Sequence, residues 1–185
     1  MPSMGKTGYL VVGPESSGTK MTAELLRTAG CRSVAIIGDD DGPELPLDGR
    51  VPLLRRSLPH GTRWIPVAEM LTLLDVDEVQ AIVTTRDWVA MVNSQIARTL
   101  APDWASALAH VRRAYAEIFT TLAERSVPFV LSSYEAMVSE PRYAPRLLDL
   151  IGLPAASVDT WNANDKWYGA ERALRPDEPA RGGDG

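Results

Sequence analysis

A loop rich in small and hydroxylated residues lies near the start of this 185-residue chain. The apolar run over residues 9–12 predicts a buried strand, and from Thr19 onward the apolar spacing is that of a helix. The residues between them and at the helix start contribute three hydroxyl groups, from Ser16, Ser17 and Thr19. Unpaired backbone N–H groups at a helix start, together with the helix dipole, favour an anion there. We therefore expect residues 13–20 to bind a phosphate-like group, although a turn that uses Gly and Ser for shape alone is the alternative.

The position of Lys20 separates this loop from the phosphate-binding loop of P-loop nucleotide-binding proteins. That loop ends in Gly-Lys followed by Ser or Thr. Here Gly18 is followed by Thr19, so the lysine comes one residue late. One residue corresponds to about 100° around a helix. The shift weakens the prediction of an ATP or GTP site.

Arg86 and Ser94 form a second group with suitable chemistry. Arg86 follows the clearest buried strand, residues 79–85, and Ser94 comes eight residues later on a predicted helix. Eight residues are about two helical turns. A guanidinium binds phosphate through two parallel N–H donors, and a serine hydroxyl adds a third. Taken alone, the pair would be interpreted as an Arg86–Asp87 surface pair and an ordinary helix serine.

Alternating strands and helices must position these groups. Strands are predicted over residues 9–12, 33–37, 51–56, 79–85 and 127–131, and helices over residues 19–29, 68–74, 88–100, 103–124 and 135–150, the last bent or restarted near Pro141 and Pro145. This alternation predicts an α/β fold, a single three-layer domain in which helices flank a central parallel sheet. Ligands bind at the carboxyl ends of such strands. The loops at 13–18, 38–42, 57–61, 86–88 and 132–134 should therefore face one cleft.

Composition narrows the classes of function. The net charge of −5 argues against non-specific binding of nucleic acid, and Cys31 is the only cysteine. No apolar run approaches the roughly 20 residues of a membrane span, and the first residues lack the layout of a signal peptide. We expect a cytoplasmic protein without a membrane span, in which residues 8–169 form the domain and residues 1–7 and 170–185 are flexible termini.

Three segments together resemble sulfotransferases. PESSGTKM, residues 14–21, resembles the family's 5′-phosphosulfate loop, and Arg86 with Ser94 matches its 3′-phosphate motif, spacing included. Residues 130–154, with Tyr134-Glu135, Pro141 and a final Gly-Leu-Pro, look like the segment that packs beside the nucleotide. The resemblance covers roughly residues 9–154. It implies a P-loop-like domain that uses 3′-phosphoadenosine 5′-phosphosulfate (PAPS) without a metal.

The resemblance implies a role for each matching residue. The 5′-phosphosulfate group would be held by Ser16, Ser17, Gly18, Thr19 and Lys20. The 3′-phosphate would be held by Arg86 and Ser94, and Tyr134 would contact the adenine side. Lys166, in the polar and aromatic segment 161–168, would close over the 3′-phosphate as a late basic loop does in the family, unless it is a solvated tail lysine.

Two positions depart from the family pattern. The lysine or arginine that precedes Ser-Gly is here Ser16, for which Lys20 or Arg55 would have to substitute. The family histidine that precedes Leu-Pro is here Ser57, and His60 stands three residues later. His60 is the leading candidate for the base, because imidazole titrates near neutral pH, and an exposed loop histidine is the alternative. Glu15 is a second candidate, and a solvated loop carboxylate is its alternative.

These features predict transfer of a sulfuryl group from PAPS to a hydroxyl or amine of a small-molecule or glycan acceptor. Two other functions stay open. A P-loop kinase or NTPase would use Mg-ATP, with Asp39 on the metal, although residues 39–41 are also typical of an acidic turn. A non-catalytic relative would keep the nucleotide fold as a binding module. The acceptor pocket would come from the loops at 42–66 and 99–106 or from a partner subunit, so a dimer is also open.

Overall fold

The computed structural model describes residues 6–33, 51–61 and 63–168. Its centre is a five-stranded sheet in the order β2-β3-β1-β4-β5, and every neighbouring pair is parallel. The strands are β1 (Thr7–Pro14), β2 (Arg32–Ser33), β3 (Pro52–Leu58), β4 (Glu78–Thr85) and β5 (Phe129–Ser133). The predicted parallel α/β sheet is thus confirmed.

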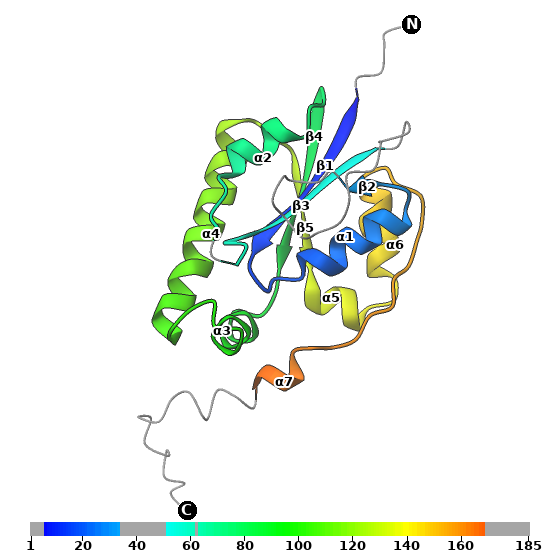
Figure 1. Cartoon of the computed structure of the whole chain (residues 1–185). Coiled ribbons are helices and arrows are strands. Elements are labelled where there is room, and N and C mark those ends of the chain that lie inside the picture. Colours follow the sequence, from blue (N-terminus) through cyan, green and yellow to red (C-terminus); the bar gives the residue numbers. More distant parts are fainter. Residues whose placement is uncertain (1–5, 34–50, 62, 169–185) are drawn as a thin grey trace, which may run out of the picture.

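Helices cover both faces of the sheet, which makes three layers (Figure 1). On one face lie α1 (Thr19–Thr28), α5 (Tyr134–Ser139) and α6 (Tyr143–Leu150), and on the other lie α2 (Val67–Leu73) and α4 (Trp104–Glu124). Two short elements complete the described chain, α3 (Trp88–Ala97) beside α4 and α7 (Asp165–Tyr168) beside α3.

The alternation of side chains along β1 divides the core into two halves. Tyr9 and Val11 pack toward α1 and α6, whereas Leu10 and Val12 pack toward α2 and α4. Successive residues of a strand point to opposite faces, so a central strand with helices on both sides is apolar throughout. The run over residues 9–12 has this pattern because β1 lies between β3 and β4.

Several predicted boundaries need correction. The helix predicted over residues 135–150 restarts near Pro141 as expected, giving α5 and α6, whereas Pro145 lies within α6 and does not break it. The strand predicted over residues 51–56 runs on to Leu58, so Ser57 belongs to a strand rather than a loop. Of the strand predicted over residues 33–37, only Ser33 lies within the described residues. The loop at 38–42 and the predicted terminal segment 170–185 lie outside them, as do residues 1–5 of the predicted segment 1–7, whereas Thr7 is the first residue of β1.

The carboxyl ends of β1, β3, β4 and β5 lie at one edge of the sheet, as parallel pairing requires. The residues that follow them are the loop at 15–18, the loop beginning at Pro59, the Arg86–Asp87 link and the start of α5. The segment carrying α7 returns to this edge from the far end of the chain (Figure 1). Four chain segments and α7 thus meet where a ligand is expected.

Candidate functional site

The loop after β1 is packed tightly against β4. An ideal Cβ at Gly13 would lie 2.1 Å from Thr84 Oγ1 and 2.9 Å from the Thr84 carbonyl oxygen, so only glycine fits there. The buried Ser17 hydroxyl lies 2.6 Å from Thr84 Oγ1, and the Ser17 N–H donates to the Pro14 carbonyl at 3.1 Å. The Ser17 hydroxyl therefore holds the loop against β4 in this structure.

Helix α1 begins without a side-chain cap. Its first residue follows Gly18, which has a left-handed φ of 101°, and its first turn contains no acidic residue. Helices α3, α4 and α5 each start with a side chain that accepts a backbone N–H, from Asp87, Asp103 and Ser133, whereas α6, like α1, has no side-chain cap. Among the described residues, no side-chain cap and no acidic residue of the first turn compensates the N–H groups and the positive dipole end of α1, which are directed toward the loop. Thr19 is buried at this point and Lys20 is exposed.

Arg86 reaches from the end of β4 to the same loop. Its Nη1 donates to the Ser16 carbonyl at 3.0 Å, its Nε donates to Asn164 Oδ1 at 2.6 Å, and the guanidinium lies 4.2 Å from the centre of the Tyr134 ring. Burial lowers the pKa of Arg86, opposed by Tyr134 and Glu135, but an arginine remains charged at neutral pH. Within the described part of the chain, Nη2 is buried and has no hydrogen-bond acceptor. One donor of the fork is thus left for an anion.

The first and second predicted groups are in direct contact. Ser16 Oγ donates to Ser94 Oγ at 3.0 Å, across 78 residues of sequence. Ser94 is buried on α3, the helix that follows Arg86 in the chain. Ser16 of the first predicted group therefore lies at one site with Arg86 and Ser94 of the second.

Glu15 connects the loop after β1 to β3 and to the end of α3. The Ser57 hydroxyl donates a short hydrogen bond to Glu15 Oε2, and Arg98 Nη1 lies 2.7 Å from Glu15 Oε1. Gln95 of α3 donates to the Glu15 carbonyl at 3.0 Å. Glu15 is only 7% exposed, so the alternative of a solvated loop carboxylate is wrong.

His60 stands at the end of this network. Its Nδ1 lies 3.0 Å from Ser57 Oγ and 3.9 Å from Glu15 Oε2, and its side chain is 31% exposed. Burial, followed by the charge of Arg56, lowers the pKa of His60, while Glu15 opposes the shift. The imidazole is therefore mainly neutral at pH 7, which is the form that can accept a proton.

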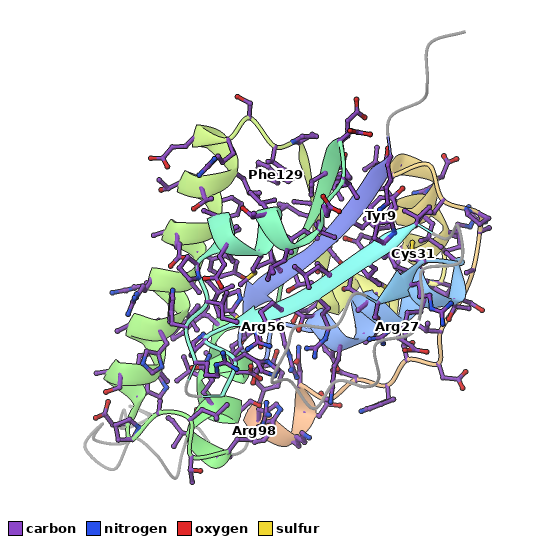
Figure 2. The ribbon with its side chains drawn as sticks, turned by 45° about the horizontal axis from the view of Figure 1, so that its top comes forward. Tyr9, Arg27, Cys31, Arg56, Arg98 and Phe129 are labelled. Atoms are coloured by element: carbon purple, nitrogen blue, oxygen red, sulfur yellow. The ribbon has the colours of Figure 1, made fainter. Side chains whose placement is uncertain are left out.

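A cavity of about 460 Å³ opens between these residues. Five cationic side chains line it: Lys20, Arg55, Arg86, Arg98 and Lys166. Among the described residues that line it, Glu15 is the only acid. Figure 2 shows Arg56 and Arg98 toward the carboxyl ends of β1 and β3, and Tyr9 and Phe129 toward the amino ends. A chain with a net charge of −5 thus concentrates positive charge at one edge.

A second pocket, of about 430 Å³, adjoins the cationic cavity and shares Gly18, Lys20, Arg86 and Ala163 with it. Its walls are more apolar and include Met21, Tyr134 and Trp161. The Tyr134 hydroxyl donates to the Trp161 carbonyl at 2.9 Å and accepts the Ala163 N–H at 2.8 Å. Tyr134 therefore fixes the returning segment at the border between the two pockets.

Lys166 lies on α7, where its Nζ is 4.6 Å from the centre of the Trp167 ring. The segment is held by Asn164, which is 3% exposed and donates to Glu135 Oε1 at 2.9 Å, and by Asn93, which donates to the Trp167 carbonyl at 2.8 Å. Residues 161–168 thus cover the site, and Lys166 lines the cavity.

Three residues that the sequence had not indicated contribute to the site. Arg98 is four residues after Ser94, so helical spacing would have placed both on one face. Ser57 was noted only as a departure from a pattern, and its position in β3 explains its contact with Glu15. No sequence signal indicated Asn164, because its partners Arg86 and Glu135 lie far from it in the chain.

Some other chemistry has no support among the described residues. They contain no group of three or more His, Cys, Asp and Glu side chains placed to hold a metal ion, and residues 39–41 lie outside them. Burial raises the pKa of the Cys31 thiol to about 11, so it is a poor nucleophile. His110 is on α4, away from the cavity-lining residues.

Within the same described ranges, none of the helices combines the length and hydrophobicity of a membrane span.

Comparisons of the sequence with models of protein families and with curated proteins return no match.

Proposed function

We propose that this protein is a sulfotransferase that uses PAPS as the sulfuryl donor and a hydroxyl or amine as the acceptor. The observation that carries the proposal is the contact between Ser16 and Ser94 beside Arg86, at the mouth of a cavity lined by five cations. A nucleotide with phosphate groups on both its 3′ and 5′ carbons requires two anion sites. The uncapped start of α1 supplies one, and the fork of Arg86 with Ser94 supplies the other.

The residues present fit such a ligand. The free Nη2 of Arg86 and the buried Ser94 hydroxyl suit a 3′-phosphate, for which a guanidinium offers paired donors. The loop over residues 16–19 and Lys20 suit the 5′-phosphosulfate. The adjoining pocket with Tyr134 and Trp161 suits a planar base, since aromatic rings stack on it. The P-loop-like character of the fold belongs to this proposal.

In the family pattern a lysine or arginine precedes Ser-Gly. Here we propose that cations from other elements supply the positive charge in its place. Arg55 of β3 and Arg98, the residue directly after α3, both line the cavity beside Glu15. In the proposed reaction they and Lys20 stabilise the negative charge that develops on the leaving phosphate. Such stabilisation works best where donors are fixed in advance and water is scarce. Arg55 is 8% exposed, whereas Arg98 is half exposed and is fixed by its ion pair with Glu15.

His60 is the proposed base. It accepts the proton of the acceptor hydroxyl while that oxygen forms its bond to sulfur, and the bond between sulfur and the bridging oxygen breaks with its electron pair going to the nucleotide. Burial and Arg56 keep the imidazole neutral and ready to accept. General-base catalysis of this kind contributes about 10²–10⁴-fold to the rate. Glu15 is already engaged by Ser57 and Arg98, so it supports the base rather than acting as one.

Thermal stabilisation tests the proposal. Adenosine 3′,5′-bisphosphate, the nucleotide product, should raise the melting temperature of the protein, because a ligand that binds only the folded state stabilises it. ATP with Mg²⁺ should raise it less. Arg86→Ala should abolish the shift, whereas Arg125→Ala, at the opposite end of the sheet, should retain it. The sulfotransferase proposal fails if the bisphosphate produces no shift or if Arg86→Ala leaves the shift intact.

Two other results identify the alternatives. A shift with ATP and Mg²⁺ that exceeds the bisphosphate shift would indicate a kinase or NTPase. A bisphosphate shift without transfer of labelled sulfate from PAPS to any of a panel of alcohols, phenols, amines and glycans would indicate a nucleotide-binding module.

A further inference from the structure

We infer that Ser57, anchored by Glu15, is a positioning residue that fixes His60 in the tautomer with its proton on Nδ1 and leaves Nε2 as the basic nitrogen. The use of His60 Nε2 as the base of sulfuryl transfer rests on the proposed function, whereas the assignment of the His60 tautomer does not. Three contacts carry the inference: Ser57 to Glu15, His60 Nδ1 to Ser57 at 3.0 Å, and Arg98 to Glu15 at 2.7 Å.

The direction of each hydrogen bond follows from the donors available. A carboxylate only accepts hydrogen bonds, and both Glu15 oxygens accept one here, Oε1 from Arg98 Nη1 and Oε2 from Ser57. The Ser57 hydroxyl has a single proton, which it donates to Glu15 Oε2. Ser57 Oγ can then only accept from His60. The proton between Ser57 and His60 therefore belongs to Nδ1.

The backbone around His60 is also fixed. The His60 N–H donates to the Arg63 carbonyl at 2.9 Å, and the Arg63 N–H donates back to the His60 carbonyl at 3.0 Å. Ser57 and Glu15 are 3% and 7% exposed, so water does not compete readily for their hydrogen bond. Since Ser57 occupies the Nδ1 edge and His60 lines the cavity, Nε2 is the nitrogen available to a ligand.

The arrangement has a chemical consequence for transfer. The acceptor O–H proton moves to Nε2 as the acceptor oxygen bonds to sulfur, and the nucleotide leaves with the electron pair of the broken bond. His60 becomes an imidazolium whose Nδ1–H still donates to Ser57. With the other tautomer Nε2 would carry a proton already and could not accept one.

The charges that face His60 are of both signs. Glu15 favours the imidazolium, while Arg56, Arg55 and Arg98 disfavour it. Lys20 and Lys166 line the same cavity. Glu15, whose Oε2 lies 3.9 Å from Nδ1, opposes the lowering of the His60 pKa that burial and then the arginines cause.

Nitrogen NMR of the full chain tests the tautomer directly. The chain has only two histidines, so a His110→Gln variant assigns the signals of His60. In ¹⁵N-histidine-labelled protein at a pH where His60 is neutral, we expect Nδ1 to have the shift of a protonated nitrogen and Nε2 that of an unprotonated one. Ser57→Ala should move the population toward Nε2–H, and Ser57→Thr, which keeps a hydroxyl, should not.

A matched control separates this effect from a general loss of stability. Ser132 is a buried serine at the end of β5 whose hydroxyl pairs with Thr22 at 3.0 Å, on a different element from His60. Ser132→Ala removes an equivalent buried hydroxyl and should leave the His60 signals unchanged. Wild-type protein with Nε2 protonated, or Ser57→Ala protein with Nδ1 still protonated, would overturn the inference. The wild-type spectrum decides the first point even if Ser57→Ala does not fold.

Kinetics then separates this inference from the proposed function. If PAPS is the donor, Ser57→Ala should lower kcat by about 10²-fold while leaving the dissociation constant for adenosine 3′,5′-bisphosphate unchanged. An Nδ1–H tautomer without bisphosphate binding would refute the sulfotransferase and keep the inference. Bisphosphate binding with an Nε2–H tautomer would refute the inference and keep the sulfotransferase.

Discussion

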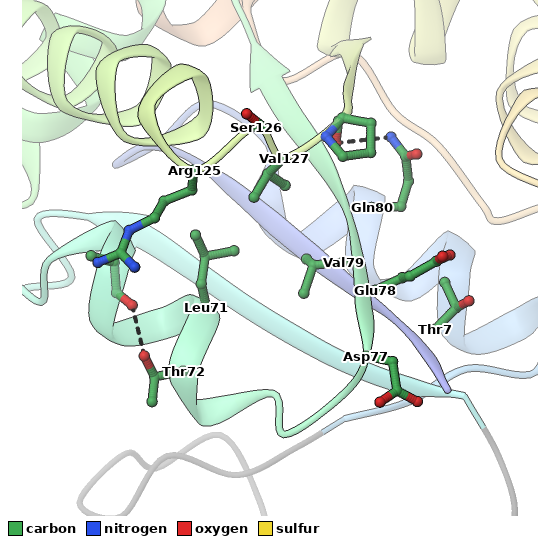
Figure 3. A pocket seen from close by; sticks show the side chains of 12 residues that line it. Thr7, Leu71, Thr72, Asp77, Glu78, Val79, Gln80, Arg125, Ser126 and Val127 are labelled. Atoms are coloured by element: carbon green, nitrogen blue, oxygen red, sulfur yellow. Dashed lines mark hydrogen bonds between the residues drawn. The ribbon is translucent and has the colours of Figure 1, made fainter. Parts of the chain in front are cut away.

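A cavity lies at each end of the sheet, and the two cavities differ in volume and in the charge of the residues that line them. The cavity at the amino ends of the strands, about 620 Å³, is larger than the cationic cavity of about 460 Å³ at the carboxyl ends. Figure 3 shows that its walls come from α2, the start of β4 and the turn after α4. Arg125 is the one cation among its described lining residues, and Asp77 and Glu78 supply two acids.

The difference lies in what the polar groups bind. At the amino end, Thr72 donates to the Ala68 carbonyl at 3.1 Å and Gln80 donates to the Pro128 carbonyl at 3.2 Å, so both satisfy nearby backbone (Figure 3). At the carboxyl end, Arg86 keeps a buried Nη2 without an acceptor in the described chain, and α1 begins without a side-chain cap. Volume therefore does not identify the site, whereas converging donors and charge do.

The largest expected effect is on nucleotide binding, and it should differ between two arginines that lie at opposite ends of the sheet. Arg86→Ala should weaken binding of adenosine 3′,5′-bisphosphate by about 10²-fold or more, because each hydrogen bond to a charged group contributes about 1.5–3 kcal/mol. Arg125→Ala should leave binding within twofold of wild type, on the order of experimental error. Calorimetric titration of the three proteins measures both. Equal losses in the two variants would remove the distinction between the ends.

Two glycines with the same backbone conformation give the next comparison. Gly18 and Gly30 have φ of 101° and 102°, but a Cβ at Gly18 would lie 3.1 Å from Tyr134 Cδ2, whereas a Cβ at Gly30 would meet nothing within 4 Å. Both alanine variants should lose about 1–3 kcal/mol of unfolding free energy from backbone strain. Gly18→Ala should lose more and should also weaken bisphosphate binding.

Urea denaturation and titration of the two glycine variants check this expectation. If Gly30→Ala weakened the nucleotide affinity as much as Gly18→Ala, the effect would come from general destabilisation rather than from the loop.

Salt should affect the carboxyl-end cavity selectively. Raising the ionic strength from about 50 mM to about 500 mM shortens the screening length several-fold. Because five cations line the cavity, the bisphosphate affinity should fall over this range, and the fall should be smaller for Arg98→Gln, which removes one of those charges. Affinity measured at several salt concentrations gives the slope. Identical slopes in wild type and variant would mean that Arg98 does not contribute to the field at the ligand.

The smallest expected effect is the pH dependence of stability from His60. Its pKa is lowered in the folded state, so the unfolded chain binds its proton more tightly. The stability that neutral His60 contributes is therefore present above the unfolded pKa, near 6.5, and is lost as the pH falls toward the folded pKa. Between pH 7.5 and pH 5, wild type should lose more stability than His60→Gln. If His60→Gln lost stability more steeply than wild type over this pH range, the His60 pKa would be raised rather than lowered in the folded state.

Much of the fold could be predicted because its signals are local. The apolar run of β1, the glycines around its loop and the spacing of apolar residues in α4 each indicate their element within a few residues. Parallel pairing follows from the alternation of elements, and it places the strand ends together. The strand order β2-β3-β1-β4-β5 does not follow, because it depends on contacts between distant segments.

The site was predictable where it follows a strand end and less so where it depends on pairing. Ser16, Arg86 and Ser94 were indicated by type and spacing, and they meet as expected. For Glu15 the alternative of a solvated carboxylate is wrong, and the sequence could not show this because its partners Ser57 and Arg98 lie 42 and 83 residues away. The role of Asn164 could not be predicted either, because it depends on the return of residues 161–168 to the cavity.

One measurement tests the central claim most directly, namely that the carboxyl-end cavity is built for a nucleotide with a 3′-phosphate. It is the ratio of the dissociation constants of adenosine 5′-monophosphate and adenosine 3′,5′-bisphosphate, two ligands that differ by that phosphate alone. If Arg86 and Ser94 bind it, the bisphosphate should bind about 10–100-fold more tightly, and the ratio should approach one in Arg86→Ala. Equal affinity of the wild-type protein for both ligands would contradict the account.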